Sequence, residues 1–177
     1  MIDYDYGVQL GPLKWVNRDL YRQARNDERI RRWCRQHTLI DEHQQEAWFA
    51  AQSADPTIEM FEIVNDIAEP VGVCGLTDIN HVCQRAEFSL YVMPYYQGSS
   101  FGRMALRTLV RWGFNELNLN MIWGETVGSN PAEVTFEQVG FEHTGYRPAM
   151  YYKGGKWQDS QIWCLLRSTW QSLPTSL

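Results

Sequence analysis

The segment QGSSFGR, at residues 97–103, carries the residue types and spacing best suited to hold an anionic ligand. It stands between a stretch with alternating apolar residues and a stretch with helical apolar spacing. Backbone N–H groups at the start of a helix have no partner within the helix, and the helix dipole adds partial positive charge there. A pyrophosphate suits such a place. Gly98 and Gly102 let the backbone approach a ligand closely, and Arg103 can add a charge-assisted contact.

On spacing alone, a second interpretation stays open, in which these glycines only form the turn between a strand and a helix. The segment contains neither the Gly-Lys-Ser/Thr of a P-loop nor the GxGxxG of a dinucleotide-binding turn. These two nucleotide-binding motifs are therefore excluded.

The elements around this segment predict one mixed α/β (α+β) domain over residues 1–177. Residues 86–93 read as a strand in which Phe88 faces one side of the sheet and Glu87 the other. The further predictions are strands over residues 6–13, 60–65, 71–76 and 121–125, helices near 17–25, 30–33, 41–49, 105–117 and 131–139, and a hairpin over 141–150 and 157–166. This order predicts a central, mixed, mostly antiparallel twisted sheet flanked by helices, with one strand–loop–helix crossover.

Composition narrows the classes of function. The net charge of −5 makes nucleic acid an improbable partner, although arginines crowd residues 18–35. No apolar run is long enough to cross a membrane, and the first residues do not form a secretory signal. The four cysteines show no CxxC pair, which is typical of reduced thiols in a cytoplasmic protein. The four histidines have no metal-ligand spacing, so we expect no metal.

Several ordered motifs resemble the GNAT N-acetyltransferase superfamily. In that family the loop Arg/Gln-x-x-Gly-x-Gly/Ala binds the pyrophosphate of coenzyme A; Gln97 and Gly102 fit it, while Ser100 replaces the middle glycine. The stretch from YVMPYYQGSSFGR to EQVGF is similar to the family core. The ending from GFEHTGY to WCLL, and the segment RNDERIRRW, are similar to the ribosomal-protein (Rim-type) branch. The resemblance implies an enzyme, an acetyl-CoA-dependent N-acetyltransferase with the GNAT fold.

The resemblance also implies site residues. The backbone of Leu90, Tyr91 and Val92 is expected to bind pantetheine like an added strand, and one of these N–H groups faces the thioester oxygen. Asn130 matches an asparagine that contacts coenzyme A, although it could instead cap the following helix. The cofactor-binding set is Leu90, Tyr91, Val92, Gln97, Gly98, Ser99, Ser100, Phe101, Gly102, Arg103, Asn130 and Phe136.

The catalytic groups are less closely matched. Glu87 is the candidate general base, with a plain surface carboxylate as the alternative; Asp78, Glu59 and Glu125 are weaker candidates. Many family members place a tyrosine acid where this chain has Phe136, and a phenyl ring has no transferable proton. Either the thiolate of coenzyme A leaves unaided, or Tyr91 or Ser129 supplies the proton. This departure keeps open an acyl-CoA-binding module without transferase activity.

The acceptor is a small-molecule or peptide amine, and a homodimer remains open. Because arginine recognises phosphate and carboxylate groups, the arginines of residues 18–35 raise the hypothesis of an acidic acceptor, such as a nucleotide-linked amino sugar or an acidic protein N-terminus. The alternative, which we favour, is a solvated helix face held by ion pairs.

Overall fold

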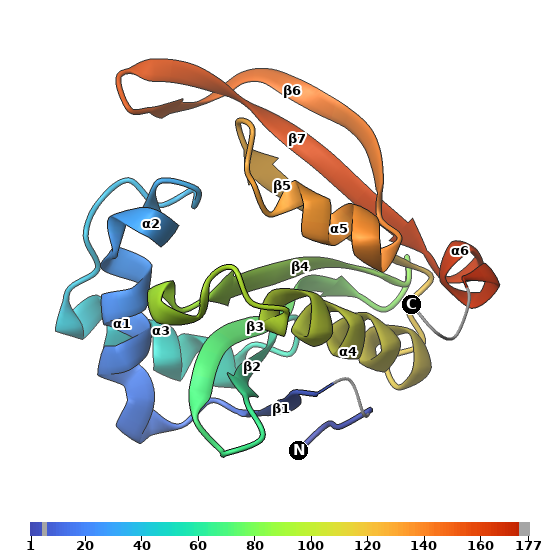
Figure 1. Ribbon diagram of the computed structural model, residues 1–177, viewed down its shortest axis with the longest axis horizontal. Helices are drawn as coiled ribbons and strands as arrows, with labels where there is room; N and C mark the ends of the chain where they lie inside the picture. The colour runs from blue at the N-terminus through green and yellow to red at the C-terminus, as the bar shows by residue number, and fades with distance from the viewer. Residues whose placement is uncertain (5–6, 174–177) are drawn as a thin grey trace.

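The computed structural model describes residues 1–4 and 7–173, and it is organised around one mixed sheet of seven strands in the order β1-β2-β3-β4-β5-β7-β6 (Figure 1). The strands β4 and β5 pair in parallel, and the other neighbouring strands pair antiparallel. The predicted mixed, mostly antiparallel sheet is confirmed. In chain order the elements are β1 Gln9–Pro12, α1 Arg18–Asn26, α2 Glu28–Arg31, α3 Glu42–Ala54, β2 Glu59–Val64, β3 Pro70–Asn80, β4 Arg85–Val92, α4 Phe101–Asn115, β5 Met121–Val127, α5 Glu133–Val139, β6 Glu142–Lys153, β7 Lys156–Leu166 and α6 Arg167–Ser172.

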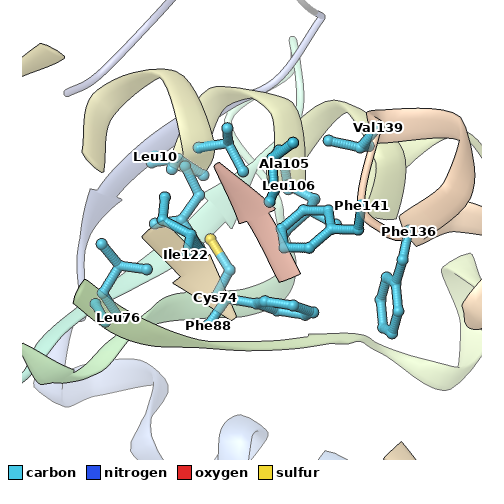
Figure 2. Packing of buried hydrophobic residues seen from close by; sticks show 14 of the residues in the cluster. Leu10, Cys74, Leu76, Phe88, Ala105, Leu106, Ile122, Phe136, Val139 and Phe141 are labelled. Atoms are coloured by element: carbon cyan, nitrogen blue, oxygen red, sulfur yellow. The ribbon is translucent and has the colours of Figure 1, made fainter. Parts of the chain in front are cut away.

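Strand β4 divides the core in two, as its alternation predicts. Phe88 belongs to the larger apolar cluster, which packs the sheet against α4 and α5 (Figure 2). Tyr91 packs against the smaller cluster, which includes Tyr21 of α1 and Phe49 of α3. Both faces of β4 are therefore covered, and a polar side chain on either face is removed from bulk water.

The strands β4 and β5 pair over a short distance and then separate. Their register runs from Arg85↔Met121 through Glu87↔Trp123, although β4 continues to Val92 and β5 to Val127. Beyond this fork, no strand of the described residues pairs with β4 on its β5 side, so the two strands diverge.

A tight packing contact lies at the fork. An added Cβ at Gly124 would lie 2.5 Å from the ring of Phe88, so only glycine leaves room for that ring. The ring also packs edge-on against Phe136 at a centroid distance of 5.0 Å.

Several local predictions differ from the structure. The predicted strand over 6–13 is observed from Gln9, while Tyr6 lies outside the described residues. Asn17 precedes α1 as predicted, but its side chain donates to Glu62 rather than capping the helix. Helix α4 ends at Asn115, before Leu117, and the short helix α6 was not predicted. The predicted helix near 41–49 is observed as α3, and Asp41 and Gln44 form a capping box at its start.

Candidate active site

The segment 97–103 leads from β4 into α4 and presents unpaired backbone amides. The N–H groups of Gly98, Ser100, Gly102 and Arg103 have no hydrogen-bond acceptor within the described part of the chain. Ser99 Oγ donates to the Tyr96 carbonyl over 2.6 Å, which steadies the turn. Oriented amides at a helix start form a site for an anion, as the sequence predicts.

The two glycines of this segment are required for different structural reasons. Gly98 has φ +82°, which favours glycine, and an added Cβ there would meet open space. At Gly102 an added Cβ would lie 3.3 Å from Cγ2 of Val92, so this glycine lets α4 pack closely on β4. Ser100 has φ −79°, which any residue adopts. Its replacement of the family's middle glycine therefore costs no backbone strain.

Two buried carboxylates flank the fork between β4 and β5. Glu87 is the last β4 residue paired with β5, and Glu125 lies two positions beyond its partner Trp123, on the same face. Their side chains are 9% and 3% exposed. Arg35 ion-pairs with both, contacting Glu87 directly and Glu125 through Nε over 3.2 Å. One guanidinium therefore joins two carboxylates at the place where the strands separate.

Glu125 is the more heavily hydrogen-bonded of the two. Ser160 Oγ donates to it over 2.6 Å, the Tyr151 hydroxyl donates to its other oxygen, and Arg147 Nη1 lies 3.1 Å away. Burial alone would raise the pKa of Glu125, but the bonds from Ser160 and Tyr151, with Arg35 and Arg147, outweigh it and lower the pKa. Glu125 therefore remains an anion.

Glu87 has the opposite electrostatic balance. Burial raises the pKa of its carboxyl, and the nearby Arg35 guanidinium offsets only part of that effect. Two neighbouring carboxyls whose pKa values are shifted in opposite directions have different chemical roles. The carboxyl with the raised pKa, Glu87, is closer to protonation than Glu125, which is the property expected of a group that exchanges a proton. Its role as the base stays a prediction.

The two candidate acids lie in different surroundings. Burial raises the pKa of Tyr91, so its hydroxyl is a weak proton donor. Cζ of Arg25 lies 5.8 Å from the centroid of the Tyr91 ring. Ser129 is exposed in the loop after β5. Neither contacts Glu87 among the described hydrogen bonds.

The remaining predicted donor-side residues divide between surface and core. Asn130 Oδ1 accepts from the backbone N–H of Ala132 over 3.0 Å and so forms a turn ahead of α5, but the N-cap residue of that helix is Ala132 and not Asn130. Gln97 and Arg103 are exposed beside the unpaired amides, and Leu90 packs on the α4 side of the sheet. Phe136 is 5% exposed, in the core among aromatic rings (Figure 2).

Most arginines of residues 18–35 have acidic partners, which supports the favoured interpretation of an ion-paired helix face. Arg18 pairs with Glu46, Arg22 with Asp19 and Glu42, Arg29 with Asp27, and Arg31 with Glu28. Arg25 is different, because no described carboxylate lies within ion-pair distance of it.

A cavity of about 340 Å³ lies between the sheet and the helices α1 and α3, and neither Glu87 nor Glu125 lines it. Its lining includes Arg25, Gln36, His37, Gln44, Trp48 and Tyr91.

The loop 32–41 closes this cavity, and distant residues fix it. Lys153 Nζ, at the end of β6, donates to the carbonyls of Arg31 and Gln36. The Asn26 side chain exchanges two hydrogen bonds of 2.8 Å with the backbone of Ile40. Figure 1 shows the β6–β7 turn extending toward α2.

No group of three or more His, Cys, Asp or Glu side chains that could hold a metal ion occurs within the described ranges. None of the described helices is both long and apolar enough to span a membrane.

Sequence reasoning missed part of this site. It named Arg35 only within the arginine stretch, ranked Glu125 below Glu87, and did not single out Tyr151, Ser160 or Lys153. The strand starts that the sequence predicts, 86 and 121, would place Glu87 and Glu125 on opposite faces. Only the observed register, in which Arg85 pairs with Met121, puts the two carboxylates on one face.

Known proteins share this sequence pattern and fold. The chain is 29% identical over 99 residues to a spermidine N(1)-acetyltransferase from Vibrio cholerae, a match that covers 55% of this chain and 57% of the relative. It is 31% identical over 81 residues to a [ribosomal protein bS18]-alanine N-acetyltransferase from Haemophilus influenzae, covering 45% and 55%. The chain thus spans little more than half the length of these curated relatives.

A solved structure shows the same fold over nearly the whole chain. The crystal structure of spermidine N-acetyltransferase from Vibrio cholerae in complex with CoA and spermine matches with a TM-score of 0.89 and 21% identity, covering 95% of this chain and 100% of that one. The family model described as an acetyltransferase (GNAT) domain matches residues 9–142, and the chain therefore belongs to the GNAT acetyltransferase family.

Proposed function

We propose that this protein is an N-acetyltransferase that moves the acetyl group of acetyl-CoA onto a primary amine by direct attack in a ternary complex. One observation carries the proposal: β4 loses its β5 partner after Glu87 and then leads directly into the unpaired amides of residues 97–103. A free strand edge suits pantetheine, and the amides suit its diphosphate. The named activity of the relatives supports the same reaction.

The donor contacts follow from this arrangement. Backbone groups of Leu90, Tyr91 and Val92 bind pantetheine, and Asn130 contacts the same arm. The diphosphate lies against Gln97, Gly98, Ser99, Ser100, Phe101, Gly102 and Arg103. Phe136 contributes packing beneath the fork rather than a proton.

Acetyl transfer at this fork needs a neutral amine. An alkyl ammonium has a pKa near ~10.4, so a base must remove its proton. Glu87 takes that proton, directly or through water, and the neutral nitrogen then bonds to the thioester carbon. As the carbon–sulfur bond breaks, the nitrogen, which is cationic after the attack, gives up a second proton to water and becomes the amide nitrogen. The thiol of coenzyme A has a pKa near ~8.5 by analogy with cysteine, so the thiolate leaves unaided and then takes a proton from water.

The relatives are named for two kinds of acceptor, spermidine and a protein alanine. Both present a primary amine, and we propose this group as the common feature of the acceptor here. Spermidine belongs in the panel of amines, because it is also the named acceptor of the Escherichia coli relative.

Release of free thiol from acetyl-CoA, measured with a panel of amines, tests the proposal. We expect amine-dependent release in the wild type and a large loss in Glu87→Gln, with acetyl-CoA binding by calorimetry retained in both. Acetyl-CoA binding without thiol release from any amine would indicate the non-catalytic binding module instead. Absence of acetyl-CoA binding would overturn both.

A further inference from the structure

The cavity between the sheet and the helices α1 and α3 has an unusual charge for an amine-binding site. Among its described lining residues there is no Asp or Glu, and Arg25 is the only Lys or Arg. A polyamine carries several ammonium groups, and one that entered this cavity would lie near the guanidinium of Arg25 with no carboxylate in the lining to offset it. Like charges in a partly desolvated cavity repel strongly.

Arg25 is fixed in place without being neutralised. Its Nε and Nη2 atoms donate to Oε1 of Gln36 over 3.3 and 3.1 Å. Gln36 is itself held, because its Nε2 donates to the Thr38 carbonyl over 2.9 Å. The guanidinium also lies over the Tyr91 ring. The neutral amide orients the guanidinium fork and leaves its positive charge uncompensated by any described carboxylate.

The cavity adjoins the proposed reaction centre. Gln36 lines it, and the preceding residue, Arg35, bonds the carboxylates at the fork. Tyr91 lines it as well, on the same face of β4 as Glu87 and about 13 Å along the strand. An acceptor that joins the fork to Arg25 must therefore hold its amine and its anionic group well apart.

From these contacts we infer that the acceptor is a small amine that also carries a phosphate or carboxylate group, and that Arg25 binds this anionic group while the amine faces the fork. The inference rests on the proposed acetyl transfer and names the acceptor class for that same site. A guanidinium fork binds both anions with two N–H groups, and the volume of about 340 Å³ fits a small molecule rather than a folded partner.

Paired amines test this inference. Glucosamine 6-phosphate is compared with glucosamine, and 6-aminohexanoate with hexylamine, with spermidine as the polycation. Binding is measured by calorimetry on protein saturated with coenzyme A, and turnover by release of thiol. We expect the anionic member of at least one pair to bind and react about 10- to 100-fold better than its neutral partner, and spermidine to be the poorest. The pair that responds identifies phosphate or carboxylate as the recognised group.

Variants locate the effect. Arg25→Gln should remove the preference for the anionic member and leave the neutral one within about twofold, while Arg25→Lys keeps part of it. Arg29→Gln is the matched control on the same stretch, because Arg29 is exposed and paired with Asp27. Circular dichroism checks that each variant folds. Should Arg25→Gln fail to fold, the same amines are compared on the wild-type protein at low and high salt. The preference for the anionic amine should shrink at high salt, because salt screens its attraction to Arg25.

Two results would overturn the inference: spermidine preferred to both anionic probes, or no difference within either pair in binding and turnover. Tight binding of an anionic probe without thiol release would instead refute the acetyl transfer and leave the anion site standing.

Discussion

Glu87 and Glu125 come from two strands that stop pairing between them, yet they share the guanidinium of Arg35. The positive charge of Arg35 reduces the repulsion between the two buried carboxylates. The hydrogen bonds to Glu125 lower its pKa, whereas burial raises the pKa of Glu87.

Replacing Glu87 by Gln should lower kcat/KM about 10²- to 10⁴-fold, because the variant cannot take the amine proton. The raised pKa of Glu87 places the acidic limb of the wild-type profile above pH 4.5. Activity should fall as the pH decreases through that pKa, and Glu87→Gln should lose this limb. Glu142→Gln, an exposed carboxylate on β6, is the control and should behave as wild type. A kcat/KM that is unchanged in Glu87→Gln would assign the base elsewhere.

Replacing Glu125 by Gln should destabilise the protein by about 1 to 3 kcal/mol at pH 7, because Arg35 and Arg147 lose a buried anion. The pKa of Glu125 is lowered on folding, so its stabilising effect is complete above the unfolded value near 4.5 and is lost as the pH falls through the folded value. Urea unfolding of both proteins should therefore show the difference narrowing below pH 4.5. A difference that stays constant with pH would mean that the charge of Glu125 does not stabilise the fold.

Restoring the family's middle glycine with Ser100→Gly should not improve acetyl-CoA binding beyond about twofold, because Ser100 already has an unstrained φ of −79°. Calorimetry measures this affinity. A marked gain in affinity for Ser100→Gly would show that backbone strain limits the site.

Gly98→Ala should cost about 1 kcal/mol or more of stability, since the φ of Gly98 is +82°. Thermal unfolding measures this effect.

Phe136→Tyr should lower stability by about 1 to 3 kcal/mol and should not raise kcat. The ring is 5% exposed in an aromatic cluster, so an added hydroxyl is desolvated. Chemical denaturation and steady-state kinetics give both values. An increase in kcat would show that the reaction lacks an acid at this position.

Lys153→Met should raise KM for the amine severalfold and leave the acetyl-CoA dissociation constant unchanged, because Lys153 Nζ fixes the loop that closes the cavity proposed for the acceptor. Lys156→Met, across the same turn, is the matched control. Equal changes in the two variants would mean that the turn, rather than this contact, matters.

The parts of the site that sequence could predict are those set by local rules. Alternation placed Glu87 and Phe88 on opposite faces of β4, and the loop 97–103 stands at a helix start, as its glycines indicate. The pairing of Arg35 with Glu87 crosses 52 positions, and that of Lys153 with Gln36 crosses 117. No periodicity encodes such contacts, since they depend on how the last hairpin and loop 32–41 meet after folding.

The contact from Lys153 to the loop 32–41 joins two segments that lie far apart in the sequence, and this distinguishes the two halves of the proposed site. The donor half lies within one continuous stretch, from β4 through α5, whereas the acceptor half is joined only when the two ends of the chain come together. Replacing the β6–β7 turn by that of another GNAT protein would therefore alter which amine binds and leave the proposed acetyl-CoA site unchanged.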